Sequence, residues 1–364
     1  MNKNSFIVEI EMQKILLKRK NINGKQSRPD MKQEVMNKRK KKRGCFRFFI
    51  TGIFFVVLFM SLGIGGLIYI TPPPPKPPVL PNPPEIGGVA ASLLDANRGD
   101  LIAEKDGTLK IYPASTTKIL TAIIALEEGK EKLGETAVIS QRAMAQEGTN
   151  IGLRPDMPVS LHELLYGMML VSGNDAAVSV AETVGASYDH FIEMMNEKAV
   201  AVGALHSHFT NANGLTDPSH YTTANDMVKI AQYAMRNRDF RDIVSKQKYP
   251  MKYQNGIFRN IENRNEFLSS GYEGANGIKT GMTEAAGDCL VASAERDGQL
   301  IIVAVYDDEN RWEDVQKWLD YGFEAVKAWE AYERKLDEEP AIYKFVNQTL
   351  GKEPKCEKEK RRDY

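Results

Sequence analysis

The sequence predicts one α/β domain whose strands come from both ends of the domain and whose middle is helical, preceded by a single transmembrane helix. Three observations predict it. Residues 46–70 are a long apolar run, residues 87–104 and 277–306 contain short segments with the apolar pattern of antiparallel strands, and residues 115–236 between them have helical periodicity. Strands that lie far apart in the sequence must then pair to form one sheet.

The apolar run at residues 46–70 exceeds the roughly 20 residues needed to cross a hydrocarbon core. It is too long for a cleaved signal peptide and is followed by prolines rather than by a small-x-small cleavage site. Residues 1–43 carry 14 Lys/Arg against 4 Asp/Glu, and six basic residues at 38–43 directly precede the run. The positive-inside bias keeps this side in the cytoplasm. We expect a single-pass cell-membrane protein whose remaining residues are extracytoplasmic.

The zero formal net charge of the chain conceals this basic start, so the remainder is acidic and a nucleic-acid partner is not expected. Nine of the thirteen residues from 72 to 84 are proline, which predicts a stiff polyproline II spacer outside any core. Three distant cysteines, Cys45, Cys289 and Cys356, make neither a disulfide framework nor a metal-ligand spacing. The expected organisation is a basic cytoplasmic segment (1–43), an anchor (46–70), a linker (72–84), a folded domain (85–330) and a charged tail (331–364).

The elements of the domain follow from periodicity and from residues that begin and end helices. A hairpin is predicted from strands 87–96 and 101–104 around the turn 97–100. Pro113 and Gly129 delimit a helix at 115–128, Ser160 and Glu163 form a capping box that begins another helix, and Thr223 caps a third. The predicted helices after the capping box include 188–202, 224–236 and 311 to about 336, and the predicted strands near the end are 277–283, 288–295 and 300–306.

Ser115 and Lys118 form the first group of residues that can carry chemistry. A serine hydroxyl is a poor nucleophile at neutral pH, so acyl transfer needs a nearby base and donors for the oxyanion. Spaced i and i+3 on the predicted helix, these two side chains share one face. Pro113 suits a helix start, where the N–H groups and the helix dipole favour negative charge near Ser115. Lys118 can act as a base if burial and a second cation, for which Lys279 is the candidate, lower its pKa.

Two tripeptides accompany this pair. Ser172-Gly173-Asn174 follows an amphipathic helix, and Lys279-Thr280-Gly281 lies on a predicted strand, where the glycine allows close approach of a ligand and the lysine offers charge to a carboxylate. Each alone is a common tripeptide without a chemical role. Chance rarely produces all three motifs in this order on helix, loop and strand.

The set Ser-x-x-Lys, Ser-x-Asn and Lys-Thr-Gly resembles that of penicillin-binding proteins and class A β-lactamases. The likeness to one group, the low-molecular-mass D-alanyl-D-alanine carboxypeptidases (serine peptidase family S11), extends beyond the triplets. It covers about residues 87–325 and rests on residues 112–121, 172–177, 213–215, 220–224, 277–281 and 286–287. The resemblance implies a β-lactamase/transpeptidase-like fold, an antiparallel sheet flanked by helices with a helical subdomain.

The resemblance also implies a reaction. The chain would be a serine D-Ala-D-Ala carboxypeptidase that removes the terminal D-alanine from peptidoglycan stem pentapeptides, binds β-lactams and needs no metal or organic cofactor. Ser115 would form the acyl-enzyme, Lys118 would accept its proton, and Ser172 would relay a proton to the leaving amine.

The remaining motif residues are implied to bind the substrate. Asn174 would orient the substrate amide and the catalytic lysine. Lys279 and Thr280 would hold the terminal carboxylate, with Gly281 beside them on the strand. The oxyanion would lie between the backbone N–H of Met282 and that of the nucleophile. Met282 stands where some members have His, and Asp156 where the family usually has Gly.

Two other functions remain open from the sequence. A β-lactamase would share the fold, but it would need a carboxylate-activated water, and no Glu-x-x-x-Asn lies on a suitable loop between the second and third motifs. A non-catalytic sensor of β-lactams or wall fragments would keep the pocket and signal through the basic segment. A metal site formed by His206, His208, Asp217 and His220 is not expected, because spacing alone does not establish ligand geometry and the family uses Lys in place of His.

Overall fold

The computed structural model describes residues 31–352. These residues divide into two compact units, one formed by the N-terminal part up to Pro73 together with Ala341–Gly351, and the other by Pro74–Pro340. The described part of the predicted basic segment begins at residue 31, and the end of the charged tail, residues 353–364, lies outside the described residues together with Cys356.

The first unit contains α2 (Met31–Ile70) and α11 (Ala341–Thr349). Phe46–Ile70 within α2 is the one described helix that is long and apolar enough to cross a membrane, and its side chains are uncovered by the rest of the protein. The predicted apolar span is therefore helical throughout. In the same unit, Asn347 Nδ2 of α11 donates to Pro72 O at 3.2 Å, just beyond the end of α2.

The second unit is built on a five-stranded antiparallel sheet with the order β2-β1-β7-β6-β5. The first hairpin of the domain pairs with its last strand, since Leu93 lies opposite Val303. This closes the sheet with the two ends of the domain, as the sequence predicts. β5 forms one edge. The strands are β1 (Ala90–Asp95), β2 (Asp100–Lys105), β5 (Ala275–Thr283), β6 (Gly287–Arg296) and β7 (Gln299–Tyr306).

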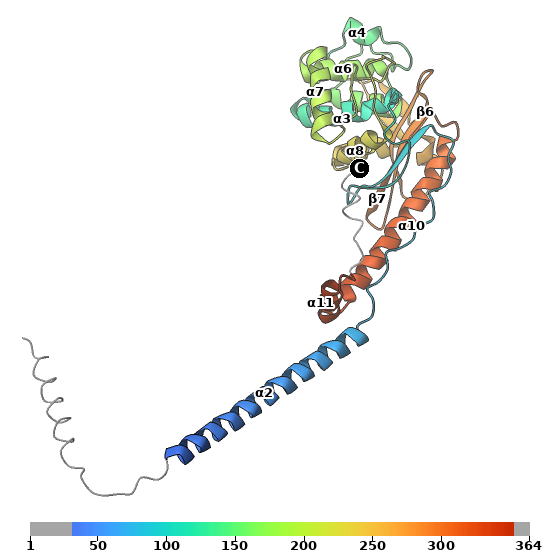
Figure 1. The fold of residues 1–364 in the computed structure, drawn as a ribbon. Helices are drawn as coiled ribbons and strands as arrows, with labels where there is room; N and C mark the ends of the chain where they lie inside the picture. Colours follow the sequence, from blue (N-terminus) through green and yellow to red (C-terminus); the bar gives the residue numbers. More distant parts are fainter. Residues whose placement is uncertain (1–30, 353–364) are drawn as a thin grey trace, which may run out of the picture. The chain divides into compact units, whose positions relative to one another are not determined.

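Helices cover both faces of this sheet (Figure 1). A helical region lies on one face, and α10 (Arg311–Glu338) runs along the other. The helical region consists of α3 (Lys118–Glu128), α4 (Gln141–Met144), α5 (Leu161–Leu170), α6 (Asn174–Gly185), α7 (Tyr188–Ala201), α8 (Ala224–Met235) and α9 (Arg238–Ser245), with a small hairpin of β3 (Lys248–Lys252) and β4 (Phe258–Glu262). This arrangement confirms the predicted fold class.

Two apolar cores follow from the period-two alternation of the strands. Side chains such as Leu94 and Ile302 face the helical region, whereas Leu93 and Val303 face α10 and pack with Trp318. Each fully buried side chain of this kind stabilises the fold by roughly 1.5–3 kcal/mol relative to its exposed state. The sheet is therefore held from both faces.

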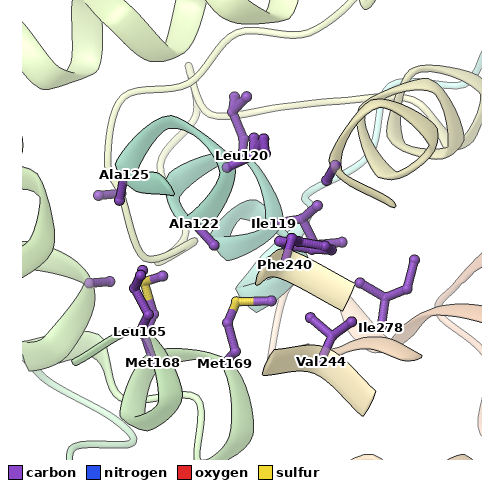
Figure 2. Packing of buried hydrophobic residues seen from close by; sticks show 14 of the residues in the cluster. Ile119, Leu120, Ala122, Ala125, Leu165, Met168, Met169, Phe240, Val244 and Ile278 are labelled. Carbon is purple, nitrogen blue, oxygen red and sulfur yellow. The ribbon is translucent and has the colours of Figure 1, made fainter. Parts of the chain in front are cut away.

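α3 is buried on every side from Lys118 to Leu126. Figure 2 shows its residues Ile119 and Ala122 surrounded by Met168 of α5, Phe240 of α9 and Ile278 of β5. A helix that is apolar all round belongs in a core. The first residue of α3 therefore has a fixed position in the domain.

The predicted capping box at α5 forms only in part. Ser160 Oγ accepts from Glu163 N at 3.3 Å, which confirms the helix start. The Glu163 carboxylate does not turn back to the cap; it accepts from Tyr249 Oη at 2.9 Å and from Lys252 N at 2.7 Å, both on β3. Glu163, the second residue of the capping box, therefore links α5 to the hairpin of β3 and β4.

The proline-rich segment differs from the expected free spacer. Pro84 O accepts from Trp318 Nε1 at 2.9 Å, and Pro81 O accepts from Tyr321 Oη at 3.1 Å. Proline lacks an N–H but keeps a carbonyl acceptor, so the end of the segment binds to α10 through donors on that helix. α10 continues to Glu338, close to the end near residue 336 that the sequence predicts.

Candidate active site

Ser115 lies in a 3₁₀ turn, Ala114–Thr117, and not in the α-helix predicted to begin there; α3 begins at Lys118. The turn brings residues i and i+3 nearly into register, and Lys118 Nζ lies 2.8 Å from Ser115 Oγ. Ala114 has a left-handed φ of 48°, a conformation that costs energy in a non-glycine residue and that recurs at active sites. The predicted contact between the serine and the lysine is confirmed.

Lys118 Nζ is held by two further oxygens. Asn174 Oδ1 lies at 2.7 Å and the backbone oxygen of Asn213 at 2.6 Å. The amide of Asn174 is oriented by its other end, because Nδ2 donates to Glu147 O at 2.7 Å. Both partners can therefore only accept from the lysine.

The sequence does not predict the role of Asn213, because this residue acts through its backbone oxygen. The following glycine explains how the carbonyl reaches the site. Gly214 has a φ of +89°, and a Cβ there would lie 1.8 Å from Ala114 O, so only glycine fits against the nucleophile turn. Asn213 Nδ2 also donates to Gln146 Oε1 at 2.7 Å.

Burial dominates the electrostatics of Lys118, whose side chain is completely inaccessible to solvent. Desolvation lowers its pKa well below the ordinary value, the Lys279 ammonium lowers it further, and Asp175 acts in the opposite direction. Burial and the Lys279 cation are the two causes expected from the sequence. A neutral amine at this position can accept a proton from the Ser115 hydroxyl.

Ser172 lies between α5 and α6 with a left-handed φ of 71° and is buried. The loop beneath it is fixed by Asp175, whose carboxylate accepts from Ile151 N and Gly152 N at 2.9 and 2.8 Å. Asn174 is the first residue of α6. The Ser-x-Asn motif therefore spans a strained turn and a helix start.

The third motif lies on the edge strand β5. Lys279 is 1% exposed, and its Nζ donates to Thr280 O at 2.9 Å. Burial, together with the nearby Arg264 guanidinium, lowers the pKa of Lys279 to about 7. A Cβ on Gly281 would lie 3.1 Å from Ser115 N, so glycine lets the strand lie directly against the nucleophile turn.

One cavity of about 400 Å³ joins these parts. Five predicted site residues line it, namely Ser115, Ser172, Thr280, Gly281 and Met282. Lys118, Asn174 and Lys279 are also buried. Lys118 is hydrogen-bonded to the Ser115 hydroxyl, and Asn174 is hydrogen-bonded to Lys118.

Two arginines that the sequence analysis does not identify also line the cavity. Arg264 donates from Nη1 to Thr149 Oγ1 at 2.9 Å, and Arg311, at the start of α10, forms an ion pair with Asp288. Guanidinium groups suit carboxylate ligands. No motif marks either residue, since each is an isolated arginine distant in sequence from the three motifs.

The histidines considered as metal ligands have other partners. His220 is buried against Thr117, and His208 Nδ1 lies 2.6 Å from Ser219 O. Within residues 31–352, no group of three His, Cys, Asp or Glu side chains could hold a metal ion. The separate contact between Ser115 and Lys118 has the geometry that nucleophilic acyl transfer with a lysine base would need.

Comparison with known proteins agrees with this geometry. The family model of the D-alanyl-D-alanine carboxypeptidases, peptidase S11, matches residues 78–310. The chain is 31% identical to the D-alanyl-D-alanine carboxypeptidase DacF of Bacillus subtilis over 67% of its own length and 64% of the relative's. It is 34% identical to DacB2 of Mycobacterium tuberculosis over 64% of its own length and 80% of the relative's. It thus spans slightly less than two thirds of DacF.

The same family appears among solved structures. The crystal structure of the Streptomyces K15 DD-transpeptidase superposes with a TM-score of 0.63 at 31% identity, covering 67% of this chain and all of that one. The matched region contains the three motifs and all five strands of the sheet. This chain belongs to the peptidase S11 family of D-alanyl-D-alanine carboxypeptidases.

Proposed function

We propose that this protein is a serine carboxypeptidase that removes the terminal D-alanine from peptidoglycan stem peptides ending in D-Ala-D-Ala, and that β-lactams acylate the same serine. One observation carries the proposal: the buried Lys118 amine lies 2.8 Å from Ser115 Oγ. Family membership and the names of the relatives support the substrate.

The hydrogen bonds around Lys118 account for its protons. A neutral amine has two N–H groups and one lone pair. The N–H groups are directed to Asn174 Oδ1 and Asn213 O, which can only accept, so the lone pair is left for the Ser115 hydroxyl. This arrangement favours proton transfer from Ser115 to Lys118 as the serine oxygen attacks.

In the proposed acylation, Ser115 Oγ bonds to the carbonyl carbon of the penultimate D-Ala and Lys118 takes the proton. The backbone N–H groups of Ser115 and Met282 stabilise the oxyanion. The C–N bond then breaks, and Ser172 relays a proton to the amine of the departing D-Ala. Lys279 and Thr280 hold the terminal carboxylate, and the placement of Gly281 against Ser115 supports a substrate strand alongside β5.

In the second half of the reaction, water attacks the Ser115 ester, releases the shortened peptide and restores the hydroxyl. The structural relative from Streptomyces K15 is named a DD-transpeptidase, which makes transfer of the acyl group to an amine the second candidate. The two reactions share the acyl-enzyme and differ in the acceptor.

The proposed location is the cell membrane, with the helix at Phe46–Ile70 as a single-pass anchor and the catalytic domain outside the cytoplasm. The length and hydropathy of this helix support the anchor, and the basic residues at 38–43 support the orientation. A substrate in the cell wall requires that orientation.

The test is release of D-alanine from a peptide ending in D-Ala-D-Ala by the full chain in detergent. Wild-type protein should release D-Ala, and Ser115→Ala should neither release it nor be labelled by fluorescent penicillin. Adding an acceptor amine separates hydrolysis from transfer. Labelling that persists in Ser115→Ala would place the nucleophile elsewhere, and rapid turnover of a chromogenic cephalosporin would favour a β-lactamase.

A further inference from the structure

Residues 210–222, here called the 210–222 segment, contact the nucleophile turn and the residues on either side of it. Thr222 and Ile111 exchange two backbone hydrogen bonds of 2.9 Å, which fixes the chain four residues before Ser115. Asn213 O binds Lys118, and Gly214 packs against Ala114. The mechanism uses the Asn213 contact but leaves unexplained a buried histidine in the same segment.

That histidine is His220, whose Nε2 lies 2.9 Å from Thr117 Oγ1. The hydrogen bond at the other ring nitrogen, Nδ1, shows which nitrogen carries the proton. Thr210 N donates to Nδ1 at 3.0 Å, so Nδ1 is an acceptor and carries no proton. In the neutral ring Nε2 then carries the proton and donates to Thr117.

The surroundings keep this ring neutral. His220 is 1% exposed. Burial lowers its pKa to about 4, Lys118 and His208 also lower it, and Asp217 opposes them. A protonated ring would place a second N–H against the Thr210 N–H. The Nε2–H tautomer is therefore the one that satisfies both neighbours.

The hydrogen bond from His220 can affect Ser115 and Lys118 through Thr117, which lies between them in the sequence. Thr117 is completely buried and lies at the junction of the 3₁₀ turn and α3. Its hydroxyl makes no capping bond to α3, although threonine commonly caps helices in this way. The hydroxyl is directed to His220 instead.

We propose that His220, as the Nε2–H tautomer, is a positioning residue that anchors Thr117 and thereby sets the register of Ser115 against Lys118. The inference rests on the proposed function, because it concerns the rate at which Ser115 is acylated. His220 does not touch the reacting atoms. It acts through one hydrogen bond to the turn that carries the nucleophile.

The experiment measures the second-order rate constant for acylation of the full chain by fluorescent penicillin in detergent. Thr117→Val removes the hydroxyl at nearly constant volume, and we expect acylation about tenfold slower, the upper range for loss of one neutral hydrogen bond. Thr117→Ser keeps the hydroxyl and should remain close to wild type.

Two substitutions at His220 separate its two bonds. His220→Asn can place an oxygen near the Nδ1 position and keep the Thr210 bond, but it cannot reach Thr117; we expect the same loss as in Thr117→Val. His220→Gln can place an amide N–H near the Nε2 position and should restore most of the rate. The double variant of Thr117→Val with His220→Asn should be no slower than either single variant.

Ser179→Ala is the matched control, since Ser179 is a buried hydroxyl that bonds to Val138 O on a different segment. It should lower thermal stability without changing the acylation rate. Wild-type rates in Thr117→Val and His220→Asn, or additive losses in the double variant, would overturn the positioning role. If His220→Asn does not fold, Thr117→Val decides. A wild-type chain that is not acylated contradicts the proposed function itself.

Discussion

Lys279 and Arg264 make the site sensitive to pH. Burial first, and then the Arg264 cation, lower the pKa of Lys279 to about 7. In the proposed mechanism a protonated Lys279 holds the terminal carboxylate, so kcat/KM should fall as the pH rises through the pKa of Lys279 in the free enzyme. Arg264→Gln removes a cation that opposes the charged lysine, so the pKa of Lys279 and the alkaline limb of kcat/KM should both shift upward.

The measurement is D-Ala release across the pH range, with Arg154→Gln as the control because Arg154 is exposed and pairs with Asp156. Arg264→Gln should also raise KM, since the arginine lines the cavity. An alkaline limb that stays in place, or that moves to lower pH, would show that Arg264 does not act on Lys279.

The sequence predicts which side chains belong to the candidate site where they form a short motif. It does not predict site residues that lie outside such a motif. Spacing places Ser115 and Lys118 together because one turn of either helix type joins residues three apart. Asn213 acts through its backbone oxygen, which every residue type possesses. Arg264 reaches the cavity from a loop, so its position depends on how the whole domain folds.

At the scale of elements, Glu163 connects α5 to β3. Burial raises its pKa, but hydrogen bonds from His162, Lys252 N and Tyr249 lower it more, and the net pKa is below the ordinary value. The ionised form therefore stabilises the fold. This stabilisation is present above the unfolded pKa of about 4.3 and is lost as the pH falls through the lower folded pKa.

Glu163→Ala should lower the free energy of unfolding by about 2 kcal/mol, because two donors on β3 lose a charged acceptor. Denaturant unfolding of the full chain in detergent at neutral pH measures this loss. Glu163→Gln keeps an acceptor oxygen and should lose less. Glu262→Ala is the control, since that carboxylate is exposed and pairs only with the exposed Lys248 on the same hairpin. Equal stability of wild type and Glu163→Ala would contradict the role.

Elements with a regular pattern were predicted, and elements stabilised by distant contacts were not. Alternation identifies β6 and β7, and caps identify the starts of α5 and α8. The sequence does not predict the helix at residues 174–185, because the small polar residues at its start are typical of a turn. In the structure, the Asp175 carboxylate near the start of α6 accepts hydrogen bonds from Ile151 N and Gly152 N, which lie in the loop before α5.

At the scale of the molecule, strands from the two ends of the domain pair within one sheet. The proline-rich chain before the first strand also binds to the domain, through α10. Trp318 and Tyr321 of α10 bind the carbonyls of Pro84 and Pro81. The proline content predicts the stiffness of the segment. It could not predict this attachment, because the donors lie more than 200 residues away.

In the proposed membrane orientation, the six basic residues at 38–43, just before the apolar span, keep the N-terminal side in the cytoplasm. Replacing all six by Ser should let part of the population insert with the catalytic domain in the cytoplasm, because the positive-inside bias is weakened. A membrane-impermeant fluorescent penicillin applied to intact cells should then label less protein than it does in wild type, while labelling in lysed cells stays equal. The control replaces the basic residues Lys130 and Lys132, which lie in the folded domain far along the chain from the span and should not affect insertion. Unchanged labelling of intact cells would mean that other features of the chain set the orientation.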